Sequence, residues 1–145
     1  MVASAGKSPA LSASVPCPID TDAVLAANRA FYAAFEARDL DAMSDVWEHS
    51  DRILCTHPGW TSLRGWGAVS ASFVALFTGA EHLQFILTGE RAEVGADMAW
   101  VSVDENILSA GSSGTVASVN VFVRAGEGGD WRMVVHHGSP VAPTA

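Results

Sequence analysis

Residues 83–139 read LQFILTGERAEVGADMAWVSVDENILSAGSSGTVASVNVFVRAGEGGDWRMVVHHGS, and this stretch decides the fold. Apolar and polar residues alternate along most of it, and a period of two is typical of β-strands with one buried face. Glycine-containing segments interrupt the alternation three times and predict tight turns. The predicted strands are 83–94, with a bend near Gly89, and then 98–108, 115–124 and 131–139. Together they predict an antiparallel meander.

The residues before the meander repeat at helical spacing instead. Three helices are predicted, beginning at Asp20 or Thr21, at the capping residue Asp39 and just after Gly65, and two short strands, 52–57 and 60–63, precede the third helix. An aspartate or threonine at a helix start accepts a backbone N–H that has no partner inside the helix. Helices followed by a meander predict an α+β fold, with helices on one face of a curved sheet.

Length and composition fit a single domain. The chain has 145 residues, of which 49 % are hydrophobic and 17 % charged, so a folded core is expected. Residues 1–19 are rich in serine, alanine and proline and predict a disordered tail, whereas 20–140 predict the domain and 141–145 a short C-terminal tail. Polar residues interrupt every apolar run of the N-terminal segment, which argues against a secretory signal, so a cytoplasmic location is expected.

The charge and the motif content exclude several kinds of partner. Sixteen acidic residues against eight lysines and arginines give a net charge of −8, so we expect neither nucleic acid nor a membrane surface as a partner. No apolar run approaches the ~20 residues that a membrane span needs. Two cysteines cannot make a cysteine zinc site, and neither HExxH nor GxSxG occurs, so no metal or cofactor is expected.

Two polar residues stand among apolar ones in the meander. If Gly111 pairs with Gly114 across the turn, Glu105 lies directly opposite Asn120. A carboxylate on an apolar face is costly unless it has a partner. The pair therefore indicates either a carboxylate and an amide aimed into a ligand cavity, or an edge pair satisfied by water or by a basic side chain such as Arg124.

The last strand carries two adjacent histidines, of which at most one faces a given cavity because neighbouring side chains point to opposite faces. His137 shares its parity with Trp131 and Met133, which makes it the more buried candidate over His136. A histidine titrates near neutrality and can shuttle protons. The alternative is a structural histidine at a sheet edge.

A third histidine, His57, stands close to two tryptophans, Trp60 and Trp66. Aromatic side chains beside one histidine suit the lining of a small-molecule pocket. They suit a plain core equally well, because tryptophan buries a large area. Cys55, in the same predicted strand, is interpreted as a packing residue.

A series of short motifs occurs in order along residues 20–140: Phe31, Phe35, Arg38 and Asp39; Met43 and Trp47; His57-Pro58-Gly59; Leu63-Arg64-Gly65-Trp66; Ala99-Trp100-Val101 and Glu105; Asn120-Val121-Phe122; Trp131-Arg132-Met133-Val134; and His136-His137-Gly138-Ser139-Pro140. In their order and spacing, these motifs resemble the SnoaL-like, nuclear transport factor 2-like superfamily. The ending also looks like that of the association domain of the calmodulin-dependent kinases.

The resemblance implies a cone-shaped, cystatin-like domain in which a strongly curved sheet wraps around a helical wedge and leaves a pocket inside. It also implies a homodimer formed through the outer face of the sheet. Members include ketosteroid isomerase, scytalone dehydratase, polyketide cyclases and limonene epoxide hydrolase, and others only bind or assemble. The fold therefore does not settle the function.

The catalytic residues of those enzymes do not transfer as sets. Tyr32, the one tyrosine of the chain, resembles the helical tyrosine of the family, but no residue matches the isomerase base. A second tyrosine, which the dehydratase pattern needs, does not exist. Two hypotheses stay open: acid–base chemistry of isomerase, cyclase or dehydratase type on a small apolar molecule, or a non-catalytic dimeric domain for ligand binding or assembly.

The candidate residues follow from these hypotheses. Glu105 or a histidine is the expected base, and Asn120, with Tyr32, is expected to hold a developing oxyanion. The candidate catalytic residues are Glu105, His137 and Asn120, and the candidate ligand-binding residues are Tyr32, Trp47, His57, Trp60, Trp66, Phe122 and His136.

Overall fold

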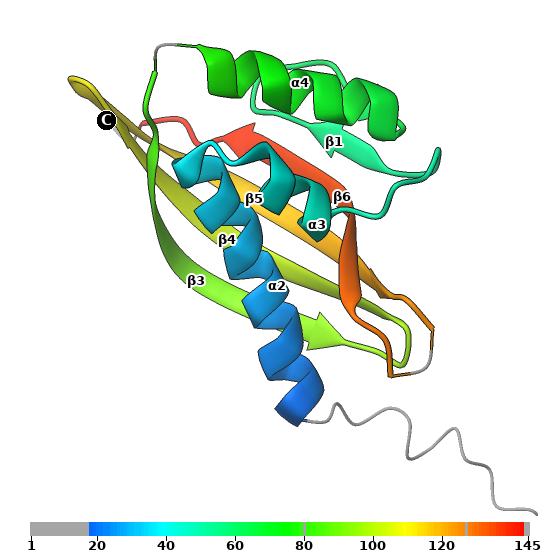
Figure 1. The fold of residues 1–145 in the computed structure, drawn as a ribbon. Coiled ribbons are helices and arrows are strands. Elements are labelled where there is room, and N and C mark those ends of the chain that lie inside the picture. Colours follow the sequence, from blue (N-terminus) through cyan, green and yellow to red (C-terminus); the bar gives the residue numbers. More distant parts are fainter. Residues whose placement is uncertain (1–17, 80, 127, 144–145) are drawn as a thin grey trace, which may run out of the picture.

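The structure is a computed structural model that describes residues 18–79, 81–126 and 128–143. In this part of the chain one six-stranded sheet carries three helices (Figure 1). The helices are α2 (Pro18–Ala37), α3 (Leu40–Val46) and α4 (Trp66–Thr78). The strands are β1 (Leu54–Thr56), β2 (Leu63–Arg64), β3 (Gln84–Val94), β4 (Met98–Ser109), β5 (Ser112–Arg124) and β6 (Trp131–Pro140). The predicted α+β fold is confirmed. Of the predicted tails 1–19 and 141–145, residues 1–17 and 144–145 lie outside the described residues, whereas Pro18 and Ile19 belong to α2 and not to a tail.

The strands follow the order β2-β1-β6-β5-β4-β3. The four long strands form the predicted antiparallel meander. Strand β1 joins its edge in parallel with β6, so the sheet is mixed rather than wholly antiparallel as expected. A parallel pair is possible here because no tight turn links the two strands, which lie far apart in the sequence.

Helix α2 crosses the long strands on one face of the sheet, with α3 beside it (Figure 1). It begins at Pro18, two residues before the predicted start, and proline is well suited to a first helical turn because it has no N–H to leave unpaired. Asp39 caps α3 as predicted, and its carboxylate accepts the backbone N–H of Ala42 at 3.0 Å. None of the helices in the described ranges is both long and apolar enough to cross a membrane.

The turn between β4 and β5 differs from the prediction. Ser109 pairs with Ser112 across a two-residue turn in which Gly111 adopts a φ of +79°, so Ser113 and Gly114 already belong to β5. Consequently Glu105 lies opposite Val116, and the predicted pairing of Glu105 with Asn120 is wrong. The predicted partner in β5 is four residues away from the observed one, and because four is an even number every side chain keeps its expected face.

A β-bulge in β6 reverses the expected faces of the two histidines. Val121 pairs with Val135 but Phe122 pairs with Met133, so Val134 is an extra residue in β6. Beyond it the inward positions change from odd to even numbers. His136 is therefore buried at 2 % exposure whereas His137 is exposed, and the expectation that His137 is the more buried of the two was wrong.

A second bulge lies at the predicted bend in β3. The pairing with β4 shifts between Thr88 and Arg91, and Gly89 adopts a φ of +67°. A glycine adopts this left-handed conformation without the strain of a side chain. The bulge changes the inward parity of β3 and turns Glu90 toward α2, where its carboxylate meets Asn28 and Arg29.

Candidate functional site

A buried carboxylate lies between the helix and the sheet. Glu105 on β4 is 3 % exposed, and its Oε2 accepts two short hydrogen bonds. One comes from the hydroxyl of Tyr32 on α2 and the other from that of Ser118 on β5, each at 2.6 Å. No donor among the described residues reaches Oε1, so only one oxygen of the carboxylate is held by the protein.

A buried amide connects this carboxylate to a histidine. Asn120, which is fully buried, donates from Nδ2 to the oxygens of Tyr32 at 3.0 Å and of Asn28 at 2.8 Å. Its Oδ1 lies 2.6 Å from Nδ1 of His136. Both amide hydrogens are thus engaged, and Asn120 keeps none for an oxyanion, contrary to the role expected from the sequence.

A cavity of about 190 Å³ opens next to Glu105 and His136. Its walls are mainly aromatic and aliphatic, and no lysine or arginine of the described residues lines it. The lining residues are Phe31, Tyr32, Phe35, His57, Pro58, Trp60, Leu76, Leu83, Phe85, Glu105, Ile107 and His136. An apolar hollow with a few convergent polar groups is the usual form of a small-molecule site.

His57 contributes a second imidazole to this cavity. Its Nε2 lies 2.9 Å from the hydroxyl of Ser72, which in turn donates to the carbonyl of Val69 at 2.6 Å. A hydroxyl has one hydrogen, so His57 donates from Nε2 to Ser72. Trp60, 44 % exposed, contacts the His57 ring at a centroid distance of 4.8 Å and stands at the edge of the cavity.

Five residues proposed from the sequence do not line the cavity. Trp47 and Phe122 are buried in the core: Trp47 follows the end of α3 and bridges to Met133 of β6, and Phe122 is on β5. Trp66 stacks instead on the ring of His49 at 4.2 Å. Asn120 lies behind Tyr32, and the β6 bulge turns His137 to the outer face.

Three residues of the network were missed in the sequence. Ser118 is two positions from Asn120 in β5, so strand alternation could have identified it. Asn28 is one helical turn before Tyr32, and a buried amide on an apolar helix face is itself a signal. Glu90 could not have been found by alternation, because the bulge decides which way it faces.

Burial sets the protonation of the ionisable groups. It raises the pKa of Glu105 above its ordinary value, although the hydroxyls of Ser118 and Tyr32 oppose the shift. Burial and the neighbouring Glu105 raise the pKa of Tyr32. Burial lowers the pKa of His57 to about 4 and that of His136 to about 3, so both imidazoles are uncharged at neutral pH.

The remaining chemistry in this region is structural. Burial raises the pKa of Cys55 to about 12, so its thiol stays protonated, in line with a packing role. Across the described ranges no group of three or more histidine, cysteine, aspartate or glutamate side chains could hold a metal ion. Arg124, the basic residue considered as a partner for Glu105, instead pairs with Asp20 at 2.6 Å.

Acidification below about pH 6 is expected to destabilise the protein through its two buried histidines. Each has a folded-state pKa below the ordinary value of 6.5, so the unfolded state binds more protons as the pH falls from 6.5 toward 4 and 3. The free energy of unfolding should fall by up to ~1.4 kcal/mol per pH unit for each histidine. Glu105 contributes with the opposite sign, because its pKa is raised.

Urea denaturation across this pH range measures the effect. His136→Phe should flatten the slope, whereas His82→Asn, at an exposed position, should leave it unchanged. Equal slopes for His136→Phe and the unmodified protein would contradict the assignment.

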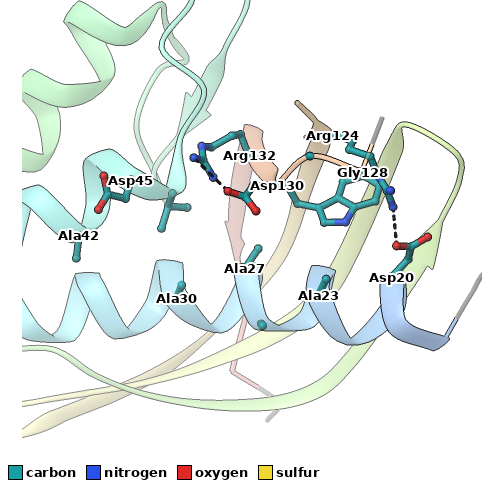
Figure 2. A pocket seen from close by; sticks show the side chains of 14 residues that line it. Asp20, Ala23, Ala27, Ala30, Ala42, Asp45, Arg124, Gly128, Asp130 and Arg132 are labelled. Carbon is teal, nitrogen blue, oxygen red and sulfur yellow. Dashed lines mark ion pairs between the residues drawn. The ribbon is translucent and has the colours of Figure 1, made fainter. Parts of the chain in front are cut away.

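A second, larger hollow of about 740 Å³ lies on the other side of α2, apart from Glu105 (Figure 2). One wall is a row of alanines on α2, and the other is the Arg124 end of β5 with the turn into β6. Arg124 pairs there with Asp20 and lies over the ring of Trp131 at 4.6 Å, and Arg132 pairs with Asp130 at 3.8 Å. Because its arginines are already paired and it holds no buried carboxylate or imidazole, we place the candidate site at Glu105.

Comparison with known proteins supports the fold and shows which family the chain is related to. The sequence model of the SnoaL-like domain matches residues 24–143. The chain is 29 % identical over 119 residues to F-box protein SKIP8 of Arabidopsis thaliana, a match that covers 82 % of this chain and 50 % of the relative. The chain thus spans about half the length of this curated relative.

Solved structures give the same result. A proposed dehydratase of the NTF2-like family from Streptomyces avermitilis is 33 % identical, with a TM-score of 0.80 over 88 % of this chain and 100 % of the other. A proposed calcium/calmodulin-dependent protein kinase type II association domain from Thiobacillus denitrificans is 36 % identical, with a TM-score of 0.69 over 88 % and 97 %. A cystatin-like protein from Caulobacter vibrioides, 14 % identical with a TM-score of 0.71 over 85 % and 90 %, supports the fold alone.

Proposed function

We propose, from the premise that the chain belongs to the SnoaL-like domain family, that its cavity performs acid–base chemistry on a small, neutral, mainly apolar molecule. The observation that carries the proposal is the buried Glu105. Its pKa is raised and only one of its two carboxylate oxygens is hydrogen-bonded to the protein, and both features suit proton transfer. Similarity to a proposed dehydratase adds support.

Glu105 is the proposed general base. Its Oε2 is held by Tyr32 and Ser118, which fixes the carboxylate in one orientation and leaves Oε1 to take a proton from the substrate. A carboxylate in an apolar wall is less well solvated than one in water, and a raised pKa makes it a stronger base at neutral pH. His136 and His57, both uncharged, are the other polar groups that can contact the substrate.

The charge and size of the cavity limit the substrate. Among the described residues no lysine or arginine lines the cavity, and both Glu105 and the net charge of −8 disfavour an anion. A volume of about 190 Å³ accommodates a small molecule, with the aromatic walls contributing most of the contact. We therefore propose a compact neutral substrate with an acidic C–H, O–H or N–H.

The experiment uses nitrobenzisoxazole as a probe of base strength. The base removes a proton from carbon, the electron pair becomes part of a nitrile as the N–O bond breaks, and a coloured cyanophenolate is released. The protein should accelerate this ring opening over free acetate at the same pH. Glu105→Gln should lose roughly tenfold or more of that acceleration, because general-base catalysis typically contributes ~10²–10⁴-fold.

The matched control is Glu93→Gln. Glu93 is an exposed residue of β3 that pairs with Arg91 at 3.4 Å, so its replacement should leave the rate unchanged. A rate no higher than that of free acetate, or equal rates for the protein and Glu105→Gln, would overturn the catalytic proposal.

The second candidate function is a non-catalytic dimeric domain for ligand binding or assembly. It is favoured by the 36 % identity to a proposed kinase association domain. We propose, with either function, a homodimer through the outer face of the sheet, defined by Trp100, Val119, Val121 and Val135. Trp100 and Val119 are each 42 % exposed, and Val121 pairs with both Trp100 and Val135 across three adjacent strands. A contiguous exposed apolar patch is typical of an interaction surface.

Trp100→Glu is expected to convert the dimer to a monomer. A charge at the centre of the patch would be buried without a partner in the dimer, and tryptophan is a frequent contributor of binding energy. Light scattering at micromolar concentration should show the mass of one chain. Val74→Glu, on helix α4 rather than on the sheet and 45 % exposed, is the control that should remain dimeric. A dimer that persists in Trp100→Glu would contradict the proposed interface.

A further inference from the structure

The direction of the hydrogen bonds in the buried network can be worked out from its outer end. Glu90 pairs with Arg29 at 3.1 Å near the surface, and an ionised carboxylate has no hydrogen to donate. Asn28 must therefore donate to Glu90 from Nδ2, at 3.1 Å, and turn its Oδ1 toward Asn120. The surface ion pair thus fixes the orientation of the first amide.

The first amide fixes the second. Asn120 donates from Nδ2 to Oδ1 of Asn28 at 2.8 Å, so its own Oδ1 faces Nδ1 of His136 at 2.6 Å. A carbonyl oxygen only accepts, and Nδ1 of His136 must carry the hydrogen. Tyr32 requires the same orientation, since its oxygen accepts from Asn120 at 3.0 Å while its hydrogen goes to Glu105.

The cavity side of His136 follows from this tautomer. The ring is 2 % exposed and touches no carboxylate, and burial keeps it uncharged, so it carries one hydrogen only. That hydrogen is on Nδ1, which leaves Nε2 with a free lone pair. Among the described residues no donor reaches Nε2, and His136 lines the cavity beside Phe31, whose ring centroid is 4.7 Å away.

We infer that the cavity selects ligands that donate a hydrogen bond: small neutral molecules whose O–H or N–H is given to Nε2 of His136. The inference rests on the proposed function only in placing the ligand in this cavity. An ether or ester of the same shape would bury Nε2 without a partner, and a buried polar atom left unpaired is costly. Glu90 and Asn28 are then positioning residues, which act through Asn120 without touching the ligand.

The tautomer is tested first, on the unmodified protein. Nitrogen-15 NMR correlations of the imidazole rings distinguish a protonated from an unprotonated ring nitrogen, and the spectrum of His136→Phe identifies the signals of His136. We expect Nδ1 in the protonated range and Nε2 in the unprotonated range. A protonated Nε2 would overturn the inference whatever the protein catalyses.

Ligand choice is tested by titration with phenol and anisole, which differ by one O-methyl group and hence by the donated hydrogen. Phenol should bind about tenfold more tightly, the range expected for one buried hydrogen bond and the unpaired atom left without it. His136→Phe should remove the difference. Ile107→Trp, which fills the cavity, should abolish the binding of both, while Leu108→Trp, on the opposite face of β4, should not.

The outcomes separate the inference from the proposed function. Equal binding of phenol and anisole, or tighter binding of anisole, overturns the donor preference and leaves the acid–base proposal standing. Binding of neither compound overturns the inference, and the benzisoxazole reaction alone then decides the acid–base proposal. A donor preference that disappears in His136→Phe, with no acceleration of the benzisoxazole reaction, supports the inference and removes the catalytic role of Glu105.

Discussion

Phe31→Ala is expected to lower the free energy of unfolding by about 3–5 kcal/mol, because it empties the centre of the contact between α2 and the sheet. Phe31 is fully buried, and its ring lies 6.3 Å or less, centroid to centroid, from those of Trp47, Phe73 and His136. These partners come from the residue that follows α3, from α4 and from β6, so they cannot all collapse into the space that the ring leaves. Urea denaturation at neutral pH measures the loss.

The matched control for Phe31→Ala is Val74→Ala on α4. Val74 is 45 % exposed, and surface substitutions of this kind usually change stability by less than ~0.5 kcal/mol. If Phe31→Ala cost no more than Val74→Ala, the ring would not be part of a packed core, and the helix would not be held against the sheet as described.

Asn120→Leu is expected to destabilise the protein by roughly 2–6 kcal/mol. Leucine has a similar volume but neither donates nor accepts, so Oδ1 of Asn28 and the N–H of His136 lose their partners inside the protein. Each buried polar group left unpaired costs about 1–3 kcal/mol, and two are left here. The loss should appear as a lower urea midpoint with an unchanged dependence on denaturant.

Asn106→Leu makes the same chemical change at a more accessible site. Its amide donates to the carbonyl of Ile86 and the hydroxyl of Thr88, each at 2.9 Å and near the surface, where water can replace it. We expect a cost of no more than about 1.5 kcal/mol. A similar cost for both variants would show that burial of the network around Asn120 contributes little to stability.

The sequence predicted the elements well and their pairing less well. Alternation identified the four strands of the meander, helical spacing identified the three helices, and the cap at Asp39 and the bend at Gly89 are confirmed. These features depend on local chemistry. The register of β4 against β5 depends instead on which residues form the turn, and the two glycines of this loop allowed more than one choice.

The residues of the candidate site also divide into those that the sequence predicted and those that it did not. Glu105 and Asn120 could be chosen in advance because a polar residue at an apolar position needs a partner, and Tyr32 was chosen through the family resemblance. The structure joins all three. The choice of His137 over His136 failed because one extra residue, Val134, reverses the faces of β6. Glu90 was missed for the same physical reason, because a bulge also lies in β3. The alternation of residues in one strand does not show where that strand has an extra residue relative to its partner.

The extra residue in β6 has a consequence for how relatives of this chain should be aligned. Losing one amino acid at Val134 would remove the bulge but leave Met133 opposite Phe122 and His136 opposite Asn120, so the interior proton acceptor would stay inside although the chain from Trp131 to it became one residue shorter. Homologues whose spacing from Trp131 to the pair differs by one residue can therefore still present the same imidazole to their ligands. Relatives should be aligned by strand pairing, with a gap allowed at the bulge, as well as by matching letters.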